Sequence, residues 1–206
     1  MIQAPTLDEF RRGYLAFEAR ERRDAMYKTA TFLVSHFWGR APEMADSLGV
    51  LLLTWNQAFY RYGPLDFQRL EEAVAGNQRQ LEAFRVRDIL SYSADDNPII
   101  LPLFHQFLAA LELCEGTKKG TRSPVAVAKA LHLLAPRFFP LWDLKIANAY
   151  ECRYSEKPAE KYLLFTEKTK HVAEQLVGRT ETLDTSKSLL KLIDEYNYAK
   201  YTKGWV

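Results

Sequence analysis

The residues best suited to do chemistry lie between Lys118 and Tyr150, in the stretch KKGTRSPVAVAKALHLLAPRFFPLWDLKIANAY. It contains one carboxylate, Asp143, and one amine inside a mostly apolar segment, Lys129. A carboxylate stabilises developing positive charge or activates water, and a neutral amine attacks electrophilic carbon. The stretch therefore offers candidate catalytic groups for both kinds of reaction.

The start of this stretch is a basic loop bounded by glycines, GTKKGTRS, with Lys118, Lys119 and Arg122. Ser123 followed by Pro124 is typical of a helix N-cap with proline at the first helical position. The free N–H groups and the dipole of such a helix end attract phosphate, and the three cations add to that attraction. The pattern predicts a phosphate-binding loop, with a merely solvated basic loop as the alternative.

Asp143 follows a passage that Pro136 and Pro140 force to be extended, and it stands where the next helix must begin. An aspartate at this position caps a helix, and capping alone explains such a residue in most proteins. A structural and a catalytic role for Asp143 are therefore both open on local grounds.

The order of basic loop, helix, proline-bearing passage and Asp-capped helix resembles the central segment of the helix-hairpin-helix DNA glycosylase superfamily, especially its 8-oxoguanine glycosylase branch. The resemblance implies that Asp143 is catalytic and that Lys145 approaches a DNA phosphate. Trp142 is an aromatic neighbour that lines the base pocket or belongs to the core.

A second segment, LLLTWNQAFYRYG, is similar to the early helix of that family, whose polar residues lie near the gap left by an everted base. The resemblance gives this role to Asn56 and Gln57, with Tyr60 on the same flank. The alternative is that these residues form the polar flank of an amphipathic helix.

Two departures from the family pattern change the expectation. The hairpin usually has a glycine-rich L-P-G-h-G turn, and this chain has GTKKGTRSP in its place. Lys129 lies 14 positions before Asp143 (143 − 129 = 14), later than the family's Schiff-base lysine. A monofunctional enzyme is favoured, and Lys129 is a surface lysine, a salt-bridge partner of Asp143 or a displaced nucleophile.

The resemblance implies a DNA glycosylase that flips a modified base out of double-stranded DNA and hydrolyses its N-glycosidic bond. Its substrate would be an oxidised purine or a bulky modified cytosine. The competing hypotheses are a non-catalytic DNA-binding module on the same scaffold and a helical protein-interaction domain. If the protein acts on DNA, Asp143 should lie in an open cleft beside the basic loop.

Spacings of three and four between apolar residues predict helices along most of the chain, and period-two alternation is absent. We expect helices over 6–37 (broken), 42–62, 65–75, 78–91, 98–114, 123–135, 144–153, 158–178 and 185–200, with loops at 76–77 and 93–98 and a surface connection over 178–185. The fold class is therefore all-α, with the C-terminal aromatic residues closing the core or stacking on a base.

The composition bounds the remaining expectations. A chain of 206 residues with 48% hydrophobic residues suits one domain, in which two helical lobes, 1–115 and 116–206, flank a cleft. A net charge of +2 neither requires nor excludes DNA as a binding partner. The chain has two cysteines in no CxxC pair, four histidines without ligand spacing, and no nucleotide-binding or common hydrolase motif. We therefore expect no metal and no cofactor. We expect a cytoplasmic monomer without membrane contact.

Overall fold

The computed structural model describes residues 4–21, 24–178 and 187–206, and every regular element within these ranges is helical. The chain is a compact all-α domain, as its apolar periodicity predicted. The predicted connection over 178–185 lies, apart from Gly178, outside the described residues, and so do the first two residues of the helix predicted over 185–200.

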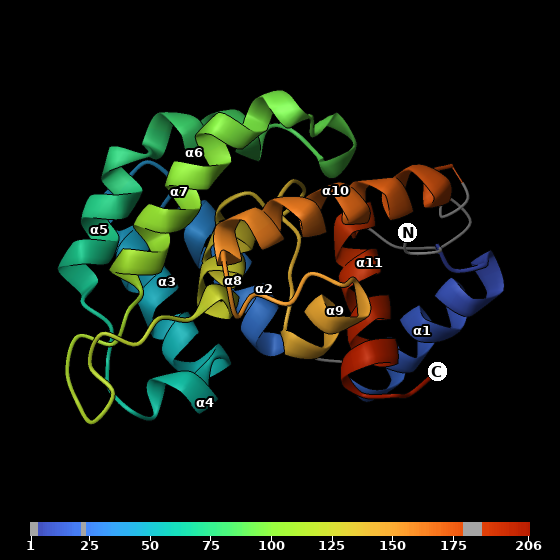
Figure 1. The fold of residues 1–206 in the computed structure, drawn as a ribbon, viewed down its shortest axis with the longest axis horizontal. Coiled ribbons are helices and arrows are strands. Elements are labelled where there is room, and N and C mark those ends of the chain that lie inside the picture. Colours follow the sequence, from blue (N-terminus) through green and yellow to red (C-terminus); the bar gives the residue numbers. More distant parts are fainter. Residues whose placement is uncertain (1–3, 22–23, 179–186) are drawn as a thin grey trace.

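The longer helices and the short elements follow one another along the chain and are shown in Figure 1. The α-helices are α1 (Leu7–Arg20), α2 (Ala25–His36), α3 (Ala41–Trp55), α4 (Gln57–Tyr60), α5 (Phe67–Gly76), α6 (Gln78–Arg85), α7 (Asn97–Ala110), α8 (Pro124–Leu134), α9 (Leu144–Ala149), α10 (Pro158–Leu176) and α11 (Leu189–Asn197). The 3₁₀ turns are η1 (Ile89–Ser91) and η2 (Ala94–Asp96), and a π-helical turn, η4 (Tyr198–Thr202), continues α11.

Several predicted helices are shorter or divided. The helix predicted over 42–62 breaks at Asn56, whose backbone leaves helical geometry (φ −118°, ψ 34°) between α3 and α4. The helix predicted over 144–153 ends at Ala149, because Glu151 adopts a left-handed conformation (φ 56°). The predicted loop at 93–98 instead holds η2 and the start of α7. Apolar spacing locates helices and does not fix their ends.

One hydrophobic core holds these elements together. Figure 1 shows α5, α6 and α7 at one end of the molecule, α1 and α11 at the other, and α2, α3 and α8 between them. Helix α8 is central, and its Ala126, Val127, Ala130 and Leu131 are fully buried. It packs against α2, α3 and α7, while α1 packs against α11. Helices from both sequence halves share this core, and the predicted division into lobes at residue 115 is not confirmed by the packing.

The basic loop between α7 and α8 is fixed to the end of α4 by two glycines. A Cβ on Gly63 would collide with the Glu115 carbonyl oxygen, and a Cβ on Gly116 (φ 87°) would collide with that of Tyr62. The Cys114 N–H also donates to the Pro64 carbonyl over 3.0 Å. This close backbone approach holds the loop against the turn after α4.

In the part of the chain that the structure describes, no helix has the length and apolar character needed to cross a bilayer.

Candidate active site

A pocket of about 740 Å³ lies where elements from both ends of the sequence meet. Its walls come from α1, α2, the last residue of α3, α8, the passage before α9, and α11 with the turn that follows it. The lining residues used below are Phe17, Asp24, Trp55, Lys129, Trp142, Asp143, Lys191, Asp194 and Tyr198. The pocket brings together Asp143 and Lys129, the two residues for which the sequence suggested chemistry.

Both carboxylate oxygens of Asp143 accept hydrogen bonds. Oδ1 accepts from the Ile146 N–H over 2.8 Å, which confirms Asp143 as the N-cap of α9. Oδ2 accepts from the Thr202 hydroxyl over 2.5 Å. Two donors from separate parts of the chain therefore fix the orientation of a carboxylate that lines the pocket.

Lys129 extends from α8 into the pocket and is partly buried. Its ammonium donates to the Trp55 carbonyl oxygen over 2.7 Å and lies 4.8 Å from the centre of the Trp55 ring. No described carboxylate lies within ion-pairing distance of it. Burial lowers the pKa of Lys129 to about 8, against the opposing influence of Asp143 and Asp194. The amine is therefore still mostly protonated at pH 7, but roughly a tenth of it is neutral, far more than for an exposed lysine.

Aromatic rings form much of the remaining wall. Trp142 is 2% exposed and its Nε1–H donates to the Pro124 carbonyl over 3.2 Å, so the ring is tied to the first turn of α8. It packs against Tyr154 and Tyr162 on its other side. Trp142 thus belongs to the core and lines the pocket at the same time.

Charged groups from α11 complete the pocket, and the sequence analysis missed them. Lys191 and Asp194 face it from α11, and Asp24, the N-cap of α2, pairs with Lys191 at 3.0 Å. Burial alone would lower the pKa of Lys191, but the nearby carboxylates outweigh burial and raise it. The sequence offered no signal for this, because the apolar residues of LLKLIDEYN lie on one side of the helix and Lys191, Asp194 and Glu195 lie on the other, a pattern typical of a charged face exposed to solvent.

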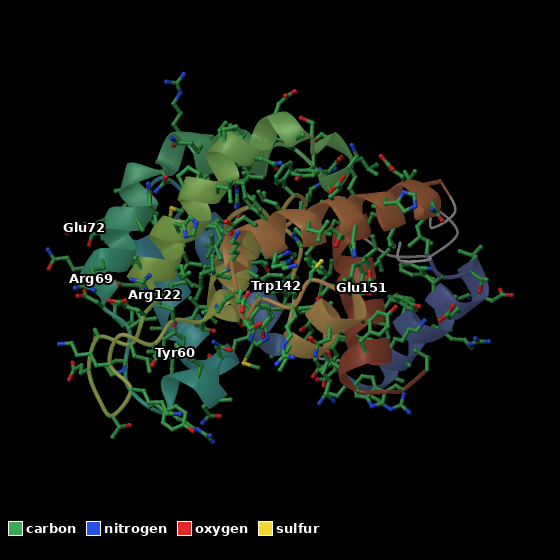
Figure 2. All side chains as sticks on the ribbon, in the orientation of Figure 1. Tyr60, Arg69, Glu72, Arg122, Trp142 and Glu151 are labelled. Carbon is green, nitrogen blue, oxygen red and sulfur yellow. The ribbon has the colours of Figure 1, made fainter. Side chains whose placement is uncertain are left out.

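The basic loop lies beyond the N-terminus of α8. Ser123 caps this helix as predicted, its hydroxyl accepting from the Ala126 N–H over 3.2 Å. Lys129 is six residues further along, about 9 Å at the helical rise per residue. Within the loop, Lys118 lies 3.7 Å from the centre of the Tyr62 ring, and Arg122 pairs with Glu112 at 3.0 Å. Lys119 is exposed. Figure 2 shows Arg122 at the same end as Tyr60, with Trp142 nearer the centre.

Lys145, at the start of α9, is exposed. Its ammonium donates to the Thr202 carbonyl oxygen over 2.8 Å. Thr202 thereby contacts both Lys145 and Asp143, which ties the end of the π-helical turn to the cap of α9.

The residues suggested for the gap behind an everted base have different surroundings. The Asn56 amide donates to the Ser123 hydroxyl over 3.3 Å and so supports the cap of α8. Tyr60 is buried, donates to the Leu111 carbonyl over 3.0 Å and does not line the pocket. Gln57 is exposed beside them. None of the three borders the pocket that contains Asp143.

Across the described ranges, no group of three or more His, Cys, Asp or Glu side chains is arranged to hold a metal ion. Comparisons with family models, with curated proteins and with solved structures found no match to this chain.

Proposed function

We propose that the protein is a DNA glycosylase that everts a modified base into the pocket and cleaves its N-glycosidic bond. The observation that carries this proposal is that one pocket is lined by an oriented carboxylate, Asp143, and a partly buried amine, Lys129, beside the rings of Trp55 and Trp142. Reactive groups with perturbed pKa values in an aromatic pocket are typical of enzyme sites.

The pocket suits a flipped nucleotide in size and surface. Its volume of about 740 Å³ falls within the range of roughly 300–1,000 Å³ found for ligand pockets. Glycosylases bind an everted base by stacking it between apolar rings. Phe17, Trp55 and Tyr198 supply such rings here.

Asp143 is assigned to the reaction centre. Cleavage of a glycosidic bond creates positive charge on the sugar, and a carboxylate held beside it stabilises that charge. The donors Ile146 N–H and Thr202 Oγ1–H hold the group in place before the substrate arrives. Preorganised charge is effective because it needs no rearrangement during the reaction.

The nucleophile is either water or Lys129. The spacing of 14 residues from Asp143 favoured water and a monofunctional reaction, whereas the position and the lowered pKa of Lys129 favour its amine. An amine that lines a pocket in its neutral form attacks the anomeric carbon directly. We therefore propose Lys129 as the nucleophile, with water as the alternative that trapping experiments separate from it.

We propose that DNA binds to the surface between the pocket and the basic loop. The helix α7, the loop and helix α8 follow one another as in a helix-hairpin-helix motif, and the loop is closed by backbone hydrogen bonds between Leu113 and Thr121 and between Gly120 and Leu113. Lys118 and Lys119 would contact phosphates, and Arg122 and Lys145 would lie at the margin of this surface. Such contacts position the duplex and do not read its sequence.

The competing hypotheses give Asp143 no role beyond capping α9. Capping uses one carboxylate oxygen of Asp143, and it does not account for a lysine held in a pocket with a lowered pKa. A buried amine of this kind destabilises the fold, and strongly shifted pKa values cluster at functional sites. This observation favours an enzyme over a DNA-binding or protein-interaction module.

The experiment that tests the proposal is an excision assay on duplex oligonucleotides. Each duplex carries one modified base, either 8-oxoguanine, 7-methylguanine or a 5-hydroxymethylcytosine bearing glucose, and mass spectrometry detects the free base. Release from at least one duplex is expected. A complete absence of release at micromolar protein, with tight binding to the same duplexes, would favour the non-catalytic DNA-binding module.

A further inference from the structure

The pocket contains a second carboxylate that the proposed reaction does not yet use. Asp194 extends from α11 into the same space as Asp143 and Lys129, and its side chain is 14% exposed. It lies on a helix remote in sequence from both. A second acidic group facing a reacting sugar has a well-defined use in glycosidic chemistry.

Asp194 is only weakly neutralised by its surroundings. Lys191 lies 3.0 Å from Asp24, 3.5 Å from Asp194 and 3.5 Å from Glu195, so three carboxylates share its single charge. Asp24 holds the closest position. Asp194 thus has a long contact to the ammonium and an open side toward the pocket.

Burial and two neighbouring carboxylates shift the pKa of Asp194 upward. Burial raises the pKa of Asp194, Lys191 lowers it, and the negative charges of Asp24 and Asp143 raise it, with a net upward shift. The group therefore retains its proton at a higher pH than a surface aspartate does. This is the property that a general acid requires.

We propose that Asp194 is the general acid of this pocket and delivers a proton to the departing base. The inference rests on the proposed glycosylase function and adds a catalytic residue to it. Its side chain enters the pocket from α11, while Asp143 enters from the N-cap position before α9 and Lys129 enters from α8.

The step is balanced in atoms and charge. The neutral Nζ of Lys129 forms a bond to the anomeric carbon, the bond from that carbon to the base nitrogen breaks, and its electron pair goes to the base. The carboxyl proton of Asp194 passes to the base, which leaves as a neutral molecule. The alkylated nitrogen then loses a proton to the Asp194 carboxylate, which restores the acid. If water is the nucleophile, its oxygen forms the bond and its proton takes the same route.

A neutral base is a poor leaving group without a proton, and general acid catalysis contributes roughly 10²- to 10⁴-fold to such reactions. A base that already carries a positive charge leaves without receiving a proton. This difference separates an acid from a residue that only maintains the shape of the pocket.

The test uses the full chain and compares the Asp194→Asn variant with the wild type in single-turnover excision. The substituted amide would keep an oxygen that accepts from Lys191 but would have no acidic proton. For 8-oxoguanine or glucosylated 5-hydroxymethylcytosine, both neutral, we expect release to slow by about a hundredfold or more. For cationic 7-methylguanine we expect a change below about threefold, because no proton is needed.

Glu195→Gln is the matched control, since Glu195 contacts the same Lys191 but does not line the pocket, and its excision rates should equal those of the wild type. Equal rates for Asp194→Asn and the wild type on the neutral base would overturn the inference, and so would equal slowing of neutral and cationic bases. If Asp194→Asn loses its cooperative melting transition, Asp194→Ser replaces it with the same expectations. Absence of release by the wild type from every duplex would instead overturn the proposed function itself.

Discussion

The Lys129 ammonium donates a 2.7 Å hydrogen bond to the backbone carbonyl of Trp55, a residue 74 positions earlier in the chain. Trp55 is the last residue of α3, where the carbonyl has no partner within its own helix. The end of α3 therefore holds the Lys129 amine inside the pocket, where no described carboxylate lies within ion-pairing distance of it. This arrangement has consequences for both stability and reactivity.

The first prediction concerns stability. In the folded protein the pKa of Lys129 is about 8, against an ordinary value of 10.5, so the unfolded chain binds more protons between these pH values. Burial of the charged amine opposes folding fully below pH 8, and the penalty disappears as the pH rises to 10.5. Lys129→Met should therefore be more stable than the wild type at pH 7, by about 1–3 kcal/mol after loss of one hydrogen bond.

Denaturant unfolding at pH 7 and pH 10 measures this difference, and the advantage of Lys129→Met should shrink at the higher pH. Lys28→Met is the control, because Lys28 is an exposed lysine on α2. A Lys129→Met variant less stable than the wild type at pH 7 would mean that the amine is well compensated.

The second prediction concerns the nucleophile. If the Lys129 amine attacks the anomeric carbon, the sugar ring opens to an imine that borohydride reduces to a stable adduct. We expect a covalent protein–DNA product that Lys129→Met lacks and Lys28→Met retains. Denaturing gel electrophoresis of labelled duplex reveals it. Base release that leaves an intact abasic strand without an adduct would identify water as the nucleophile, as the spacing of 14 residues predicted.

The third prediction concerns the basic loop. Lys118 and Lys119 are exposed, and each contact with a phosphate adds close to one unit to the log-log salt dependence of duplex binding. The combined Lys118→Ala and Lys119→Ala change should flatten this slope by up to about two units and leave base preference unchanged. Titration of labelled duplex at several salt concentrations measures both quantities.

Arg79→Ala is the control for this experiment, since Arg79 is exposed and belongs to α6, a helix that Figure 1 shows away from the loop between α7 and α8. Its slope should match that of the wild type. An unchanged slope in the lysine double variant would show that the loop is merely solvated and that any DNA is bound elsewhere.

Local features of the site could be predicted from the sequence. Ser123 with Pro124, and Asp143 after a proline-bearing passage, are cap signals that depend on a few neighbouring residues, and both caps are present. The helices were located for the same reason, because burial of one face requires apolar residues at regular spacing.

The long-range features could not be predicted. Thr202 reaches Asp143 across 59 positions, and no local pattern relates the two residues. Asp194 lies in the pocket because α11 is buried from several sides, which is a property of its neighbours. Conversely, the resemblance of LLLTWNQAFYRYG to a family helix suggested that Tyr60 lies near an everted base. In the structure Tyr60 is instead hydrogen-bonded to the Leu111 carbonyl and does not line the pocket. Tertiary packing decides which polar groups share a cavity.

The central claim is that Asp143 is a catalytic carboxylate, and single-turnover base release by Asp143→Asn tests it most directly. Asparagine caps helices about as well as aspartate, so this variant should keep its stability to within about 1 kcal/mol. Asp66→Asn, which changes the N-cap of α5 outside the pocket, is the matched control and should release base at the wild-type rate. On a duplex that the wild type processes, the account predicts that Asp143→Asn is folded and slower by at least about a hundredfold. A folded Asp143→Asn variant that releases the base at the wild-type rate would contradict it.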